Sequence, residues 1–419
     1  MSIYDEVTLK NGLRIIGERI PHFRSVSVGM WVGAGSQYER PEENGLSHFL
    51  EHMMFKGTQR RSARQIAEEM DAVGGQMNAF TAKECTCYYA KVIDEDLPLA
   101  MDILSDVLLH SIFDEKELEK EKGVILEEIS MVEDSPEDLV HELIMTARFG
   151  DQALARPILG PAKNVSGFSQ KDLKDYWGRM YRPENTVLAL AGNYDWAQVK
   201  EVAERLLGEW TAEGQGRPAS LTQAAPAQAL RKEKDTEQLH ICLGFPGVRQ
   251  DSPQLYPLTI LNSIFGGAMS SRLFQKIREE SGMAYSVYSY PSSYGDCGLT
   301  AVYAGTSLQH ADSVVRMIRE EIDRLLRDGV TQAEFAQARA QLKGSYILGL
   351  ESTSSRMSAI GRRKLLMNNT KTQTQVLEEI ERVSYQDVLD VAREIFSAPC
   401  AAALVGKGAQ QVDLSAFQL

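Results

Sequence analysis

The order of helices and strands predicted for the first half of the chain returns in the second half, and this repetition constrains the fold more than any single motif. The first half shows a hairpin signal at Asn11-Gly12, strands near 25–32, 76–81, 85–93 and 185–192, and helices near 45–56, 64–73, 97–110, 115–147, 169–179 and 195–208. The second half shows a strand, two helices, two adjacent strands and two long helices in the same order. We therefore expect an internal duplication.

The chain of 419 residues is too long for one hydrophobic core and suits two domains of roughly 200 residues. Between them, the stretch near 212–231 is small and polar, contains Gly and Pro, and has no apolar period, which is typical of a linker. We predict domains at 1–212 and 232–419, joined by the linker 213–231. Because strands come in adjacent pairs and helices in runs, we expect an α+β fold with two tandem, internally duplicated domains, each a mainly antiparallel sheet packed with helices.

Composition excludes several classes of protein. The formal net charge of −13 disfavours binding to nucleic acid, which needs a basic surface to displace counterions from phosphates. No apolar run approaches the roughly 20 residues that span a bilayer, and the N-terminus does not resemble a signal peptide, so we expect no membrane association. The five cysteines are an odd number and scattered, which indicates free thiols in a reducing compartment, and we expect a cytoplasmic protein.

The segment H-x-x-E-H at residues 48–52 carries the clearest chemistry in the chain. On a helix with about 100° per residue, His48, Glu51 and His52 share an arc of about 100°. Two imidazoles one turn apart supply two of the three protein ligands of a catalytic zinc ion. A carboxylate beside them that does not bind the metal can act as general base toward water. The order of the residues is that of the inverzincin signature.

A third ligand is expected from the acidic helix that begins near residue 115. Glu121 and Glu128 are seven positions apart and lie on one face within about 20°, whereas Glu127 points about 100° away from Glu128. Glu128 can therefore bind the metal while Glu121 orients a ligand from behind. The alternative for the two histidines and Glu51 is a polar stripe on an amphipathic helix, and the alternative for Glu121 is a surface glutamate.

These motifs together resemble the pitrilysin family of zinc peptidases, in its short two-domain form typical of mitochondrial processing peptidases and their bacterial relatives. The resemblance covers essentially the whole chain and is most specific over residues 45–58 and 124–128. It implies one Zn²⁺ per chain, held by His48, His52 and Glu128, with Glu51 as the base. It also implies that Asn78, Ala79 and Thr81 belong to an edge strand that holds a peptide by main-chain pairing.

The resemblance adds a second set of residues in the C-terminal half. By analogy, Tyr285 donates a hydrogen bond to the scissile carbonyl oxygen, and Arg278 supports either Tyr285 or the substrate backbone. Members of this family close like a clamshell around the substrate, so the resemblance implies a homodimer in which Arg278 and Tyr285 reach the partner's metal. For the tyrosines of this region, strand packing is the alternative.

Two further correspondences concern specificity. Phe55 takes the place of a residue that lines the pocket after the cleaved bond, and Asp138 and Glu142 take the place of acids that bind a substrate arginine. A solvated helix face is the equal alternative for the two acids. In the C-terminal half, Ile260, Ser263, Ile264 and Ser345 align with the metal-site residues, so that half is expected to bind no metal.

The sequence thus predicts a zinc-dependent endopeptidase that cleaves peptides or unfolded protein segments inside a chamber between two subunits, with a preference for a basic residue upstream of the cleaved bond. A catalytically silent binding subunit is one alternative, but such a protein is expected to lose a ligand or the base. A zinc hydrolase acting on other substrates is the second alternative, and the peptide-pairing strand disfavours it.

Overall fold

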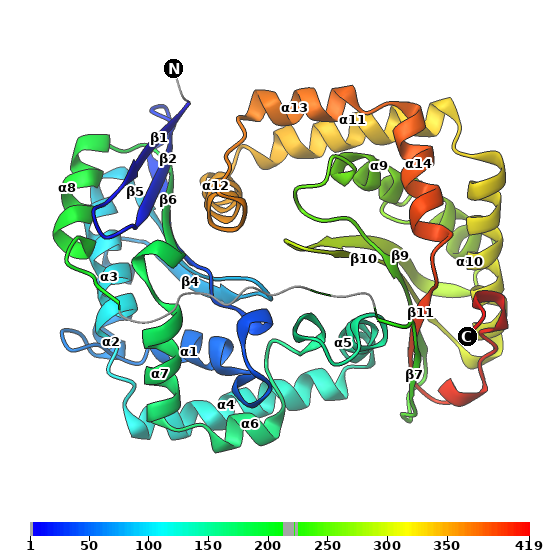
Figure 1. Cartoon of the computed structure of the whole chain (residues 1–419), viewed down its shortest axis with the longest axis horizontal. Coiled ribbons are helices and arrows are strands. Elements are labelled where there is room, and N and C mark those ends of the chain that lie inside the picture. Colours follow the sequence, from blue (N-terminus) through cyan, green and yellow to red (C-terminus); the bar gives the residue numbers. More distant parts are fainter. Residues whose placement is uncertain (1–2, 213–221, 223–224) are drawn as a thin grey trace. The chain divides into compact units, whose positions relative to one another are not determined.

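The structure is a computed structural model that describes residues 3–212, 222 and 225–419. The chain forms two compact units, each built around its own sheet (Figure 1). The first unit comprises Met1–Ile129, Arg156–Ser220 and Ile347–Thr372, and the second comprises Ser130–Ala155, Leu221–Tyr346 and Gln373–Leu419. The two-domain α+β fold expected from the sequence is confirmed.

The sheet of the first unit has six strands in the order β1-β2-β6-β3-β5-β4, and all neighbours are antiparallel except β2 and β6. The hairpin between β1 and β2 turns at Gly12, whose φ of 93° costs a residue without Cβ little. The strands are β1 (Tyr4–Thr8), β2 (Arg14–Arg19), β3 (Ser25–Val32), β4 (Gln76–Thr81), β5 (Thr86–Ile93) and β6 (Thr186–Gly192). Strand β4 is therefore an edge strand, as expected.

Helices cover both faces of this sheet. One face packs against α1 and α3 in the main core of the unit. The opposite face, with Trp31 and Val187, packs against Met357 and Ile360 of α12. The helices are α1 (Leu46–Met54), α2 (Ala63–Ala72), α3 (Leu97–His110), α4 (Glu115–Asp134), α6 (Ala162–Gly167), α7 (Gln170–Met180), α8 (Trp196–Leu207) and α12 (Thr353–Met367).

The sheet of the second unit repeats this arrangement. Its order is β7-β11-β8-β10-β9, and the only parallel pair among its described strands is β7 with β11. The strands are β7 (Ala229–Lys232), β8 (Leu239–Pro246), β9 (Ala284–Ser293), β10 (Gly298–Thr306) and β11 (Ala401–Val405). Strands β7, β11, β8, β10 and β9 match β2, β6, β3, β5 and β4 in order and in direction of pairing. This agreement supports the duplication inferred from the sequence.

The helices of the second unit follow the same plan. They are α5 (Pro136–Phe149), α9 (Leu255–Phe265), the π-helical segment η6 (Phe274–Glu280), α10 (Leu308–Asp328), α11 (Gln332–Gly349), α13 (Gln373–Arg382) and α14 (Tyr385–Phe396). Helix α5 comes from the N-terminal half of the chain but packs on β8 and β11, whereas α12 comes from the C-terminal half but packs on β2, β3 and β6. Each unit therefore takes most of its residues from one half and exchanges one helix with the other.

The prediction of a single helix over residues 115–147 is wrong. The structure divides it into α4 and α5, with Ser135 between them and Pro136 as the first residue of α5. Proline has no N–H to donate to a preceding turn, and the Ser135 hydroxyl accepts the N–H of Asp138 as a helix cap. This break lets α5 leave the first sheet.

The predicted linker 213–231 lies largely outside the described residues. Its described end is not linker, because Ala229–Lys232 forms strand β7 and pairs with β11. The predicted domain boundary does separate the strands of the two sheets. Strands β1 to β6 precede it in the chain, and strands β7 to β11 follow it. None of the helices in the described part of the chain is long and apolar enough to cross a membrane.

Candidate metal centre and active site

Helix α1, which carries the H-x-x-E-H segment, begins at a glycine and is capped by a buried acid. Gly45 has a φ of 108°, and a Cβ there would lie 2.8 Å from the carbonyl oxygen of Leu159. The carboxylate of Glu39 accepts the backbone N–H groups of Gly45 and Ser47, at 2.9 and 2.7 Å. Burial raises the pKa of Glu39, and the hydrogen bonds from Asn44, Ser47 and Gly45 partly offset this rise. The start of α1, next to His48, is therefore held by the surrounding chain rather than by its own side chains.

His48, His52 and Glu128 come together as the sequence predicted. Their nearest ligand atoms all lie within 4.8 Å of one another. Oε2 of Glu128 is 3.6 Å from Nε2 of His48 and 3.7 Å from Nε2 of His52. In a tetrahedral centre with metal–ligand bonds of about 2.0–2.1 Å, two ligand atoms lie about 3.4 Å apart. The observed distances are too long for hydrogen bonds and close to this value, so the three residues fit a zinc ion.

The protonation of His48 also suits a metal ligand. Burial, and to a lesser extent the neighbouring His52, lowers the pKa of His48 to about 4. The imidazole is therefore neutral near pH 7, as metal binding requires.

Glu121 orients His52 from the side away from Glu128. Its Oε2 lies 3.0 Å from Nδ1 of His52, and its Oε1 lies 2.6 Å from Nζ of Lys56. A proton on Nδ1 is then donated to Glu121 and the lone pair of Nε2 faces the other ligands. The side chain of Glu121 is only 7% exposed, which excludes the alternative of a surface glutamate. The sequence reasoning missed Lys56, although its position four residues after His52 was a usable signal.

Glu51 lies outside the ligand group, as a general base must. Its Oε2 accepts a hydrogen bond of 2.5 Å from the hydroxyl of Thr81, the last residue of β4. Burial raises the pKa of Glu51, an effect that the Thr81 hydrogen bond and His52 partly oppose. A carboxyl group with a raised pKa takes up a proton more readily, which suits a base in catalysis.

The other residues predicted in the first unit lie around this site. Asn78 is exposed on β4, and its Oδ1 accepts the N–H of Ala79 at 2.8 Å. Ala79 packs against the core. Phe55 ends α1, is half-buried, and its ring centroid lies 6.0 Å from that of Tyr88.

Four predicted residues belong to the second unit instead. The Arg278 guanidinium lies over the ring of Tyr285, 5.3 Å from its centroid, and over that of Phe274 at 4.7 Å. The side chain of Tyr285 is 77% exposed, so the alternative of strand packing does not hold for it. Asp138 and Glu142 lie on α5, where Asp138 is exposed. The roles of these four residues stay predictions.

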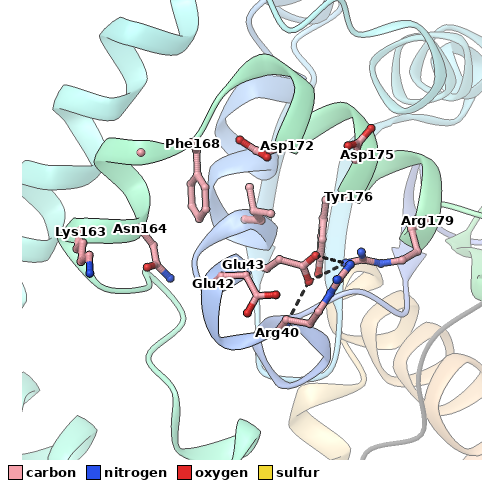
Figure 2. Close-up of a pocket in the computed structure, with 12 residues that line it drawn as sticks. Arg40, Glu42, Glu43, Lys163, Asn164, Phe168, Asp172, Asp175, Tyr176 and Arg179 are labelled. Carbon is pink, nitrogen blue, oxygen red and sulfur yellow. Dashed lines mark hydrogen bonds and ion pairs between the residues drawn. The ribbon is translucent and has the colours of Figure 1, made fainter.

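A separate cavity of about 450 Å³ lies in the first unit, between the loop before α1 and helices α6 and α7 (Figure 2). Glu43 forms ion pairs there with Arg40 at 3.0 Å and with Arg179 at 2.7 Å. The cavity contains none of the predicted site residues. It borders the metal helix through Leu46, the first residue of α1, and through Tyr176, whose hydroxyl hydrogen-bonds Ser47 at 2.7 Å.

A His₂Glu ligand set beside a free carboxylate is that of a zinc hydrolase. Two family models match the chain, "Insulinase (Peptidase family M16)" over residues 14–162 and "Peptidase M16 inactive domain" over residues 167–342. The chain is 46% identical to the zinc protease YmxG of Bacillus subtilis, over 95% of this chain and 97% of the relative. It is 41% identical to a zinc protease of Streptomyces coelicolor, over 95% of this chain and 88% of the relative.

A comparison with solved structures agrees with this family on the level of the fold. A crystal structure of a protease from Helicobacter pylori matches with a TM-score of 0.91 at 20% identity, over 96% of this chain and 99% of that one. The protein is a metallopeptidase that uses one zinc ion. It belongs to peptidase family M16, the pitrilysin family, as the motif around His48 indicated.

Proposed function

We propose that this metallopeptidase is an endopeptidase in which Glu51 is the general base and His48, His52 and Glu128 hold the zinc ion. The observation that carries the proposal is the position of Glu51. It lies on the same helix as two ligands, is excluded from the ligand group, and is hydrogen-bonded to the end of edge strand β4. The base thus lies between the metal ligands and the strand that a peptide would pair with.

Zinc, when bound, supplies a Lewis acid that lowers the pKa of water and polarises the peptide carbonyl. Glu51 takes a proton from the attacking water and returns it to the leaving amine. Tyr285 donates a hydrogen bond to the carbonyl oxygen as negative charge develops there. Arg278, stacked on the Tyr285 ring, keeps this tyrosine oriented.

Substrates are extended peptides or unfolded protein segments. Among the described strands, β4 pairs with β5 on one side, so its other edge offers the outward main-chain groups of the segment Asn78–Thr81 for pairing with a peptide. Phe55 contributes an apolar wall to the pocket after the cleaved bond. The requirement for an extended backbone favours peptides over other hydrolase substrates.

A basic residue upstream of the cleaved bond is recognised by Asp138 and Glu142. They lie one turn apart on α5. Asp138 is exposed, so its carboxylate is open to a guanidinium group, which carboxylates bind through paired hydrogen bonds.

Two chains form a homodimer that encloses the cleavage chamber, with Arg278 and Tyr285 acting at the partner's metal. The support is indirect: the pair lies in the second unit and Tyr285 is largely exposed. None of the five cysteines, all within the described part of the chain, forms a disulfide bond, which supports a reducing compartment, the cytoplasm.

The test compares zinc content and cleavage of arginine-containing fluorogenic peptides for the wild type and for Glu51→Gln. We expect about one zinc per chain in both and a loss of kcat of roughly 10²–10⁴-fold in the variant. Glu127→Gln is the matched control, because Glu127 is an exposed glutamate on the helix that carries Glu128. A wild type that holds zinc but cleaves nothing across a varied peptide library is a binding subunit, and absence of zinc from the wild type refutes the ligand assignment.

The dimer and the specificity need separate tests. Co-expression of Glu51→Gln and Tyr285→Phe chains restores part of the activity only if Tyr285 acts at the partner's metal. For specificity, Asp138→Asn with Glu142→Gln is expected to raise KM for an arginine peptide and leave KM for its norleucine counterpart unchanged. An equal rise in KM for both peptides would refute the proposed preference for a basic residue.

A further inference from the structure

We propose that Thr81 is a positioning residue for Glu51, which ties the general base to the strand that binds the substrate. The inference rests on the proposed role of Glu51 and adds a residue to that machinery. Its basis is the 2.5 Å hydrogen bond from Oγ1 of Thr81 to Oε2 of Glu51. Among the described side chains, Thr81 is the one that hydrogen-bonds the Glu51 carboxylate.

The direction of this hydrogen bond follows from its surroundings. Thr86, the register partner of Thr81 on β5, is fully buried and donates its hydroxyl proton to the carbonyl oxygen of Ala34 at 2.9 Å. The Thr86 hydroxyl also faces Oγ1 of Thr81 as a donor, at 3.4 Å, so Thr81 accepts on that side and its own proton is left for another partner. An ionised carboxylate only accepts, so the Thr81 proton points to Glu51.

This geometry makes the two oxygens of Glu51 unequal. Oε2 is occupied by a hydroxyl donor, so a proton that Glu51 removes from water goes to Oε1. After that transfer, Oε2 is a carbonyl oxygen and still accepts from Thr81. The hydrogen bond therefore persists through the proton transfer and fixes the carboxyl plane without competing for the proton.

The same residue connects the base to the substrate strand. Along β4, Gln76, Asn78 and Phe80 are exposed, whereas Ala79 and Thr81 share the half-buried face, which packs on α1. A peptide that pairs with the outer edge of β4 uses its backbone, while the Thr81 side chain stays on Glu51. Binding of substrate and orientation of the base thus depend on the same strand but on different atoms.

Because substrate pairs with the β4 backbone and Glu51 bonds the Thr81 hydroxyl, a change at this hydroxyl should affect kcat and KM differently. Loss of the Thr81 hydroxyl should disorient Glu51 and lower kcat, while main-chain pairing, and with it KM, is retained. A hydrogen bond to a charged group contributes about 1.5–3 kcal/mol, which corresponds to roughly a 10- to 150-fold loss of kcat.

The experiment compares Thr81→Val, which keeps the shape and removes the hydroxyl, with Thr81→Ser, which keeps the hydroxyl. For each full-length variant, zinc content, kcat, KM and melting temperature are measured beside Glu51→Gln. We expect Thr81→Val to lose about 10- to 150-fold in kcat, with KM within about threefold and one zinc per chain. Thr81→Ser should recover to within about threefold of wild-type kcat. Thr8→Val, the same change at an exposed position of β1, is the matched control and should leave the kinetics unchanged.

The outcomes separate the two proposals. Substantial activity in Glu51→Gln refutes the proposed base itself. An inactive Glu51→Gln beside a Thr81→Val enzyme with near wild-type kcat refutes the positioning role alone. Equal losses in the Val and Ser variants, or loss of zinc from either, also overturn it, because packing or the metal site would then explain the effect.

Discussion

Helices α1 and α9 take the same place in two sheets of the same strand order, yet only α1 carries the chemistry. Each follows the third strand of its sheet's shared order and precedes the edge strand, β4 or β9. Where α1 has His48, Glu51 and His52, the sequence alignment places Ile260, Ser263 and Ile264 on α9. The fold therefore tolerates either set.

The two helices differ in what surrounds these positions. Ile260 and Ile264 are buried in the core of the second unit, and the Ser263 hydroxyl bonds the Thr259 carbonyl oxygen of its own helix. The polar residues of α1 instead need partners from distant segments, among them Glu121 and Thr81. Burial of a polar side chain costs free energy unless it is hydrogen-bonded. A catalytic helix is thus stable only where the rest of the unit supplies such partners.

The largest effect is expected from making α1 resemble α9. His48→Ile removes one of three ligands, so zinc content should fall from about one per chain to nearly none and activity by on the order of 10³-fold or more. Zinc analysis and peptide cleavage measure this. The matched change in α9, Ile260→Val, should cost about 0.5–1.5 kcal/mol of stability and leave zinc content and kcat unaltered. Retention of zinc by His48→Ile would contradict the ligand set.

Helices α12 and α5, which are exchanged between the two halves of the chain, provide a second test of how the two units differ. Met357 of α12 is fully buried and its Sδ accepts the indole N–H of Trp31 at 3.2 Å. Met357→Ala should therefore cost about 2–5 kcal/mol and raise amide hydrogen exchange in β2, β3 and β6 of the first unit. Ile144→Ala on α5 should raise exchange in β8 and β11 instead. Loosening of β8 and β11 by Met357→Ala would contradict the assignment of α12 to the first unit.

The smallest effect concerns the equivalent starts of α4 and α11. Burial alone would raise the pKa of Glu334, but hydrogen bonds from Arg272 and the Thr331 N–H, and the charge of Arg272, lower it to about 2. A carboxyl group whose pKa is lower in the folded than in the unfolded chain stabilises the fold at pH values above its unfolded pKa of 4.5. This contribution is lost as the pH falls toward 2. Because the pair is partly exposed, we expect Glu334→Gln to cost only about 1 kcal/mol at pH 7.

Urea denaturation at pH 7 and pH 3 measures this contribution, and the gap between wild type and Glu334→Gln should narrow at the lower pH. The control is Glu117→Gln at the start of α4, because the one ion-pair partner of Glu117 in the described part of the chain is Lys120, itself largely exposed. Its effect should be within about 0.5 kcal/mol at both values of pH. A gap that widens on acidification would show that the sign of the Glu334 contribution is wrong.

Much of the fold was predictable because the patterns are local. The hairpin at Gly12, the positions of most strands and most helix positions follow from apolar period and turn residues within short windows. The break between α4 and α5 was missed because the helical period continues on both sides of Ser135-Pro136. Nothing in that period indicates which sheet the second helix packs on.

By itself, the sequence predicted the candidate metal ligands and the neighbouring carboxylate of Glu51. Helix geometry places residues three and four positions apart on one face, so H-x-x-E-H defines a site without knowledge of the rest of the chain. Only the tertiary structure decided that α5 and α12 pack on each other's expected sheets, that His52 is the ligand that Glu121 contacts together with Lys56, and that Thr81 hydrogen-bonds Glu51. Nearly all of these contacts join segments far apart in sequence, and the packing that pairs such segments leaves no period in either of them.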